Sequence, residues 1–295
     1  MKIALSLLAC ILLSISVKAT YQARDILIWN TDTLSLFSNP LELRSDWKEL
    51  YKKISIAIEN EDKRLYPKKY EKKEVEVLFS TACWRGYIAE WEIINSQIYL
   101  NNIYACQDKN VRIDLKKILP KEFNNGLIFA NWINGKLRAP KGVCLEWLNL
   151  DYNSIYEKEL VLEFKNGILT EFKTFSNSIE KKSNFSKDKN PNNFLNFVYS
   201  HIHWDKLPDF KNKHIQTFVG IQPNREGKLD SIIWEYTYLL DESGIITDRN
   251  NLFIKEAIRI AELIPDWDVI YQRGLIVKRS LMIIFDENNR VKYTK

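Results

Sequence analysis

Glycine and proline are scarce in this chain of 295 residues, which contains nine glycines and eight prolines. These counts exclude collagen-like repeats, Gly/Ser linker arrays and long proline-rich spacers. The formal net charge is only +5, so no nucleic-acid partner is expected. Hydrophobic residues nevertheless make up 45% of the chain and aromatic residues 13%. The chain therefore has the composition of a folded protein, and its length suggests about two domains.

Catalytic motifs are also missing. The sequence contains no G-x-S-x-G, no H-E-x-x-H and no G-x-x-x-x-G-K-[ST]. Its three histidines have no carboxylate or cysteine at ligand spacing, so we expect no metal and no cofactor; they are His201, His203 and His214. An enzyme hypothesis rests only on carboxylates, which are too common to identify a site: Glu90, Glu92, Glu146 and Glu163.

The only long apolar run stands at the start of the chain, where Lys2 precedes Ile3–Ile15. Val17 and Ala19 fit the small-residue positions before a signal-peptidase site. We therefore predict a signal peptide over residues 1–19, export to the periplasm or the outer-membrane periphery, and no transmembrane span in the mature chain, because the run is shorter than about 20 residues. Two alternatives remain: a lipoprotein acylated at Cys10, and an uncleaved anchor.

Export would expose the three remaining cysteines to an oxidising compartment. An odd number excludes a framework made of disulfides alone. Cys83 and Cys106 lie just beyond two predicted neighbouring strands, which makes them the candidate disulfide pair. Buried free thiols are the alternative.

The segment 20–74 begins with a strand pattern from Asp25 to Asn30. Asp46 with Glu49 three residues later has the form of a capping box. Apolar residues at helical spacing then predict a helix; they are Trp47, Leu50, Tyr51, Ile54 and Ile58. The charged stretch 59–73, which contains Pro67, is interpreted as a solvated connector that ends the helix.

Residues 75–175 have the pattern of an antiparallel β domain. The predicted strands are 75–79, 87–94, 97–104, 126–133, 135–138, 160–165 and 168–175, with a helical interruption at 113–119. Hairpin turns are expected at 95–96, 134–135 and 166–167, the last two being Asn-Gly. The region is rich in aromatic residues, which we interpret as core rather than as a ligand platform: Trp84, Tyr87, Trp91, Tyr99, Tyr104, Phe129, Trp132 and Trp147.

The stretch 176–193 is mostly Ser, Asn and Lys with one proline, and it has no apolar face. It is therefore predicted to be a linker between domains at 20–175 and 194–295. After a short helix over 194–203, strand patterns flank a turn at 224–227, and Asn250 or Asn251 is placed to cap a following helix. Ile254, Ala257, Ile258 and Ala261 share one face of that helix. With a final strand over 277–285, the predicted class is α+β, with the carboxy-terminal order β-β-α-β.

Three features of residues 205–286 occur in a specific order. They are the Asn-Arg-Glu-Gly-Lys turn between two strands, Glu256-Ala257 within the helix, and Pro265-x-Trp267 after it. Together with Gln272-Arg273-Gly274 and the closing strand, this combination resembles the TonB carboxy-terminal domain family. One departure is Val269, where the family commonly has a second proline. Residues 20–175 resemble exported proteins of Bacteroidetes type that carry no assigned activity.

The resemblance implies that the last strand offers an edge to an extended peptide of an outer-membrane receptor or another envelope protein. The implied binding residues are Lys278, Arg279, Ser280, Leu281, Met282 and Ile283. The opposing interpretation is an edge blunted by Lys278 and Arg279. Direct energy transduction is not expected, because the proline-rich spacer is missing. We thus expect a binding or adaptor protein of the envelope; the alternative is an exported enzyme or carbohydrate-binding protein acting through the aromatic β domain.

Overall fold

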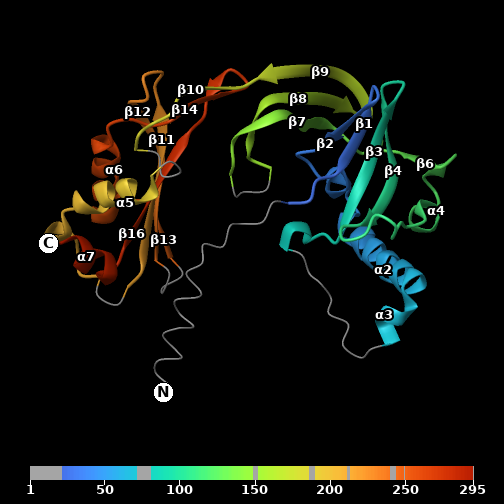
Figure 1. The fold of residues 1–295 in the computed structure, drawn as a ribbon, viewed down its shortest axis with the longest axis horizontal. Helices are drawn as coiled ribbons and strands as arrows, with labels where there is room; N and C mark the ends of the chain where they lie inside the picture. The colour runs from blue at the N-terminus through green and yellow to red at the C-terminus, as the bar shows by residue number, and fades with distance from the viewer. Residues whose placement is uncertain are drawn as a thin grey trace. The chain divides into compact units, whose positions relative to one another are not determined.

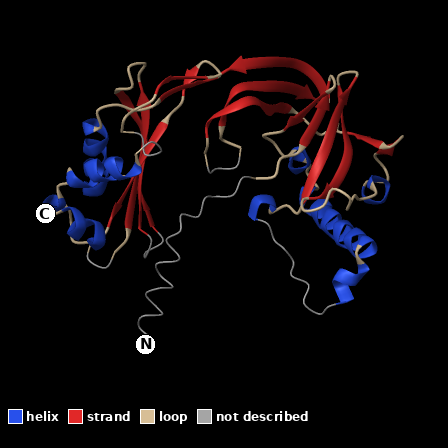
Figure 2. Ribbon diagram, viewed as in Figure 1, coloured by secondary structure: helices blue, strands red, loops and turns tan. Residues whose placement is uncertain are grey.

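The fold belongs to the α+β class, as predicted, and is described from a computed structural model of the chain. The structure describes residues 22–71, 81–148, 152–185, 190–210, 213–239, 244–248 and 250–294. The predicted signal peptide and the predicted strand 75–79 lie outside these residues. Contacts divide the chain after Phe175 into two compact units, and Figures 1 and 2 show the elements of each. None of the described helices is long and apolar enough to cross a membrane.

The first unit is built on one curved sheet in the order β2-β1-β3-β4-β9-β8-β7, with the short β5–β6 hairpin attached to β4. Its strands are β1 (Ile26–Trp29), β2 (Asp32–Ser35), β3 (Tyr87–Ile94), β4 (Gln97–Ala105), β5 (Phe123–Asn124), β6 (Leu127–Phe129), β7 (Gly135–Glu146), β8 (Ile155–Lys165) and β9 (Ile168–Ser176). The sheet is not a pure antiparallel meander, because β1 pairs with β3 in parallel. The two ends of the sheet approach each other: the N–H of Phe37, just after β2, donates to the carbonyl of Arg138 on β7.

Two of the three predicted hairpin turns join neighbouring strands. Asn95 and Ser96 adopt positive φ between β3 and β4, and Asn166 and Gly167 do so between β8 and β9. The prediction for Asn134-Gly135 is wrong, because β6 ends at Phe129 and the long strand β7 pairs with β8 instead. The Asn134 side chain accepts from the N–H of Asn166, so it supports the neighbouring turn.

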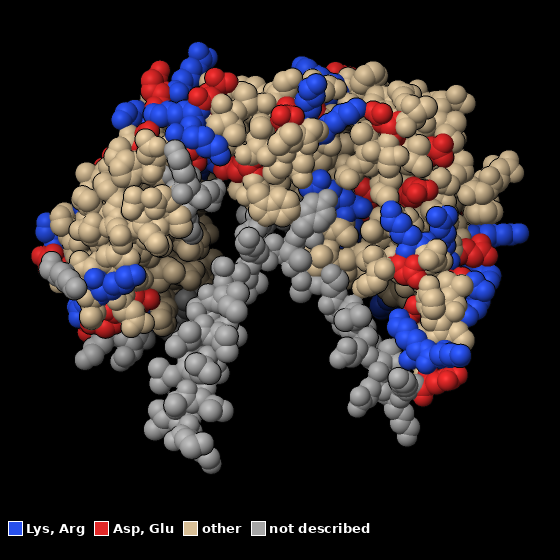
Figure 3. All heavy atoms as spheres, in the orientation of Figure 1, with Lys and Arg blue, Asp and Glu red and all other residues tan. Residues whose placement is uncertain are grey.

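The predicted helix is α2 (Trp47–Leu65), which buries Leu50 and Ile54. The capping box is not formed: Asp46 makes no side-chain cap and instead accepts from the Arg44 guanidinium. The connector prediction for 59–73 is also wrong over nearly all of its described part, because α2 runs to Leu65 and a short helix, α3 (Pro67–Glu71), follows. Ion pairs such as Glu59–Lys63 support these extra turns. Figure 3 shows mixed charges over this end of the unit.

A buried ion pair joins the residues just before β1 to the start of β3. Asp25 and Arg85 are almost completely buried and lie 3.0 Å apart. The Asp25 carboxylate also accepts from the indole N–H of Trp91 and the backbone N–H of Ala89, while Arg85 donates to the carbonyl of Ala23. Burial raises the pKa of Asp25, and Arg85 and Trp91 oppose that rise. Each charge thus depends on the other for its solvation.

The second unit holds two antiparallel sheets, in the orders β13-β12-β11-β16 and β10-β14-β15. Its elements are β10 (Ser178–Lys181), α5 (Pro191–Ser200), β11 (Ile215–Pro223), β12 (Leu229–Leu239), β13 (Gly244–Ile246), α6 (Leu252–Leu263), β14 (Val269–Gln272), β15 (Leu275–Ile276), β16 (Arg279–Phe285) and α7 (Glu287–Tyr293). The predicted β-β-α-β order is present as β11, β12, α6 and β16. Asn251 caps α6 through its side chain, and the helices gather on one face of the larger sheet (Figure 2).

The predicted linker is wrong over its first part. Ser178–Lys181 form β10, which pairs with β14. Ser183 is buried; its hydroxyl donates to the Asp266 carboxylate, and its N–H donates to the Asp268 carboxylate. The polar composition of this stretch predicts a linker. The partners that order it lie more than 80 residues away in the sequence, so no local pattern indicates them.

We predict that a fragment 176–295 is more stable than a fragment 194–295. The shorter one loses the β10 strand and the hydrogen bonds donated by the Ser183 N–H and by its single hydroxyl proton, each worth about 1 kcal/mol. Urea unfolding should show a free energy lower by at least about 2 kcal/mol for 194–295. Equal free energies of unfolding for the two fragments would show that residues 176–193 do not contribute to the fold, as expected of a linker.

Removing one member of the buried pair should destabilise the first unit strongly. Arg85→Met leaves the Asp25 carboxylate buried without its counter-charge and should cost about 3–5 kcal/mol in urea unfolding. Adding Asp25→Asn removes that charge and keeps an oxygen for Trp91, so the double variant should be more stable than Arg85→Met alone. If the double variant had a lower free energy of unfolding than Arg85→Met alone, the two side chains would not be energetically coupled.

Candidate functional site

The motif pieces that carry the family resemblance are bonded to one another. The backbone N–H of Trp267 donates to the carbonyl of Gly227 at 2.7 Å, and the Lys228 ammonium donates to the carbonyl of Pro265 at 2.6 Å. Gly227 has a φ of +76°, and a Cβ there would lie 2.6 Å from the Trp267 carbonyl oxygen. The turn between β11 and β12 and the segment after α6 therefore form one joint. Trp267 is buried in the same core cluster as Ala257 and Ala261.

Glu256, the charged member of the motif, is buried on α6 and holds the segment after α5. Its carboxylate accepts from the backbone N–H of His203 at 2.6 Å and from the Arg259 guanidinium at 2.6 Å. Burial acts to raise the pKa of Glu256, but Arg259 and the His203 N–H hold that pKa below its usual value. The role of this carboxylate is therefore to bind internal donors, not to carry out acid–base chemistry.

β16 is an edge strand of the larger sheet, with β11 as its only neighbour among the described strands. Leu281 and Ile283 are buried on the α6 face and pair in register with Val219 and Thr217. In an antiparallel pair, alternate residues turn both backbone groups toward the same side. The N–H of Ile284 donates to the Tyr199 hydroxyl, which places the backbone groups of Ser280, Met282 and Ile284 on the outer side.

The outer side of β16 is closed at one end by the chain itself. The Tyr199 hydroxyl of α5 accepts from the N–H of Ile284 at 3.1 Å, and the Asn289 amide of α7 donates to the Ile284 carbonyl at 3.2 Å. Within the described part of the chain, the outward groups of Ser280 and Met282 have no partner. The open edge is therefore two outward-facing residues long.

The six binding residues named from the sequence fall into three groups. Lys278 precedes the strand, and the Arg279 side chain donates to the carbonyl of Asp268. Neither charged residue belongs to the stretch from Ser280 to Met282. Leu281 and Ile283 face the core. Only Ser280 and Met282 present both backbone groups outward. Sequence reasoning missed Tyr199 and Asn289, which limit the edge, because no local pattern links them to β16.

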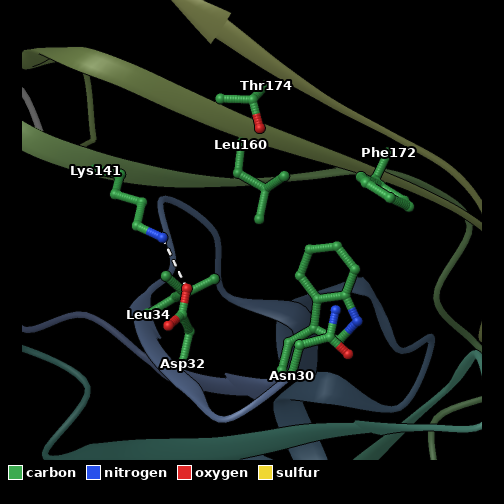
Figure 4. Close-up of a pocket in the computed structure, with 8 residues that line it drawn as sticks. Asn30, Asp32, Leu34, Lys141, Leu160, Phe172 and Thr174 are labelled. Carbon is green, nitrogen blue, oxygen red and sulfur yellow. Dashed lines mark hydrogen bonds and ion pairs between the residues drawn. The ribbon is translucent and has the colours of Figure 1, made fainter.

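The first unit offers a small hollow of about 140 Å³ between β1–β2 and the strands β7, β8 and β9 (Figure 4). Lys141 reaches across it to Asp32 at 2.7 Å, and Phe172 packs edge-on against Trp29. This is room for about five water molecules. It brings together one ion pair and two rings, without a nucleophile or a pair of carboxylates, so its chemistry does not identify a reaction.

The other candidates of the β-rich region do not gather at one place. Glu90 and Glu92 share the Asn101 amide, whereas Glu146 and Glu163 lie on β7 and β8 beside other partners. Among the aromatic residues Tyr87, Trp91 and Tyr104 are buried, but Trp84 and Trp147 are about half exposed. The core interpretation thus holds for only part of that set.

The structure joins Cys83 and Cys106 in a disulfide, and Cys144 is a free thiol. Burial raises the pKa of the Cys144 thiol, which opposes its ionisation. No group of metal-binding side chains occurs among the residues that the structure describes. His203 and His214 each lie near one carboxylate, Glu256 and Asp286 respectively.

No protein-family model matches the chain, and neither the curated proteins nor the solved structures contain a significant match to it.

We predict that Glu256→Gln destabilises the second unit above pH 5 and has little effect in acid. The native pKa of Glu256 lies below its ordinary value of 4.5, so the charged form contributes stability above that pH. This contribution is lost as the pH falls through the native pKa. Urea unfolding at pH 7 should show a loss of about 1.5–3 kcal/mol, typical of hydrogen bonds to a charged group.

The matched control is Glu262→Gln, an exposed position on the same helix. It should change the free energy of unfolding by less than about 0.5 kcal/mol at either pH. A Glu256→Gln effect that is the same at pH 3 and pH 7 would show that charge is not the cause.

Proposed function

We propose that this protein is an exported binding or adaptor protein of the cell envelope, whose second unit docks an extended peptide by strand addition at β16. The observation that carries the proposal is the pair of outward residues Ser280 and Met282, whose backbone groups have no partner within the described chain. Strand addition needs such groups and little else. The β-β-α-β order and the bonded motif pieces support the resemblance to TonB carboxy-terminal domains.

The local charges favour an edge that is open to a partner. The opposing interpretation required Lys278 and Arg279 to blunt the strand. The Arg279 side chain is instead folded back onto the carbonyl of Asp268, and Lys278 stands before the first strand residue. The charged side chain at the start of β16, that of Arg279, is therefore engaged by the carbonyl of Asp268 and not by the strand edge at Ser280 and Met282.

The length of the open edge sets the affinity that main-chain bonding can supply. Two outward residues offer two N–H and two C=O groups, and four hydrogen bonds at about 1 kcal/mol each amount to about 4 kcal/mol. This free energy corresponds to a Kd of about 1 mM. Side-chain contacts must add to it, so the partner should be a receptor or other envelope protein with a specific sequence beside the paired residues.

The alternative function, an exported enzyme or carbohydrate-binding protein acting through the first unit, has less support from the described residues. Its four candidate carboxylates do not converge, and none of them lines the hollow of about 140 Å³ or a second one of about 470 Å³ beside α2.

We predict that Ser280→Pro abolishes peptide docking without unfolding the chain. Proline removes only an outward N–H there, so the β11–β16 ladder is retained. A photo-crosslinking amino acid at position 282 should capture an envelope protein in the native background and lose it when Ser280→Pro is added. Thermal unfolding should change by only a few degrees.

Leu281→Pro is the matched control, because its N–H faces β11 in the paired register with Val219. It should lower the melting temperature sharply. If Ser280→Pro unfolds the chain as Leu281→Pro does, position 280 is paired within the sheet and docking at this edge must be abandoned. Capture that persists in a folded Ser280→Pro variant would also contradict strand addition.

A further inference from the structure

The larger sheet of the second unit has helix α6 on one face only, and the opposite face carries a row of aromatic rings. Phe218 stacks on Tyr236 with ring centroids 4.9 Å apart, and Tyr236 stacks on Trp234 at 5.8 Å. These residues lie on the face opposite Val219 and Ile221, which belong to the α6 core. We refer to this surface as the aromatic face.

Trp234 is the last ring of this row, and it occupies space that is free because the residue opposite it on β11 has no side chain. It pairs in register with Gly220, and a Cβ on that glycine would lie 2.2 Å from Cε2 of the indole. The ring therefore leans over bare backbone, and any larger residue at position 220 would displace it. Although its neighbours hold it in place, 41% of Trp234 remains exposed. It is an ordered aromatic surface in contact with solvent.

The residues that the register pairs beside Trp234 on this face are neutral, and the charged residue next to them is Asp230, whose carboxylate accepts from the Ser231 hydroxyl at 3.4 Å. The register places Gln222 opposite Ser231 and Ser280 opposite Gly220, so amide and hydroxyl groups border the ring. Next to them, Met282 pairs with Phe218. Every residue paired on this face across β11, β12 and β16 is uncharged, in a chain in which 27% of residues are charged.

We propose that the aromatic face binds an uncharged polysaccharide, with Trp234 as the main stacking residue. The C–H faces of sugar rings pack on aromatic rings, and sugar hydroxyls bond to neutral amides and hydroxyls such as those of Gln222 and Ser231. An anionic polymer would lose hydration here without meeting a counter-charge. The surface is an open sheet face rather than a pocket, which suits a chain of sugars that gains contacts along its length. The proposal is independent of peptide docking at β16.

The test is affinity electrophoresis of the full chain in native gels that contain a soluble β-glucan, a mannan or a xylan, with alginate as the anionic comparison. At least one neutral polysaccharide should retard the protein, and alginate should not. Trp234→Ala should weaken the retardation at least about tenfold, because the stacking surface is lost. Trp234→Phe keeps a ring and should retain part of it, with unchanged thermal unfolding as evidence that both variants fold.

Trp84→Ala is the matched control, since Trp84 is an exposed tryptophan of the first unit (54%); it should bind as the unmodified chain does. Absence of retardation by all three neutral polysaccharides would overturn the proposal. So would equal retardation by alginate, or an equal loss in Trp84→Ala. A dimer in sedimentation analysis that Trp234→Ala dissociates would assign the aromatic face to self-association instead.

Discussion

The hydrogen bond from the Trp267 N–H to the Gly227 carbonyl is the constraint on which the second unit depends. It joins the tip of the β11–β12 hairpin to the chain that leaves α6, and the Lys228–Pro265 bond reinforces it. Lys181 adds a third segment, because its ammonium donates to the carbonyl of Glu226 and pairs with Asp266. This joint thus fixes the chain between the end of α6 and the start of β14, and it attaches β10 to the same place. Trp267 is buried there.

The properties of β16 follow from this arrangement. The smaller sheet ends at β15, and the chain enters β16 with Arg279 tied to the carbonyl of Asp268, next to the joint. At the other end, Tyr199 and Asn289 occupy the outward groups of Ile284. Both ends of the strand are therefore fixed by internal contacts, and the unpartnered stretch lies between them. A short opening of this kind limits unwanted sheet-to-sheet association, which long free edges promote.

Local chemistry made much of the fold predictable from the sequence. Asn-Gly at 166–167, the Asn251 cap and the Pro265 stop act through neighbouring backbone, so their effects could be read from adjacent residues. The β-β-α-β order and the edge position of the closing strand follow from the same signals and from the family resemblance. Most strands of the β-rich region were also placed correctly, because β-branched and aromatic runs mark them.

Most of the errors involve distant partners, and the missed cap of α2 is a local exception. Residues 178–183 have linker composition, yet β14, Asp266 and Asp268 supply the contacts that order them. Asp46 was expected to cap α2, but the Arg44 guanidinium competes successfully for its carboxylate. Asn134-Gly135 has a strong hairpin sequence but joins no hairpin, because β7 pairs with β8. The Asn134 side chain instead accepts a hydrogen bond from the turn at Asn166. The restriction of the binding edge to two outward residues was equally invisible, because Tyr199 approaches from a helix 85 residues earlier.

The alternation of β16 separates the two proposed surfaces although they share residues. Ser280 and Met282 direct their backbone groups outward in the plane of the sheet and their side chains away from α6, whereas Leu281 and Ile283 direct their side chains into the core. A substitution that changes a side chain at 280 or 282 alters the aromatic face and leaves the N–H groups in place. Ser280→Pro removes the N–H together with the Ser280 hydroxyl, but it leaves the ring of Trp234 over Gly220. Side-chain chemistry can therefore be varied on this strand without changing the outward N–H groups, because the period of the strand assigns the two to different directions.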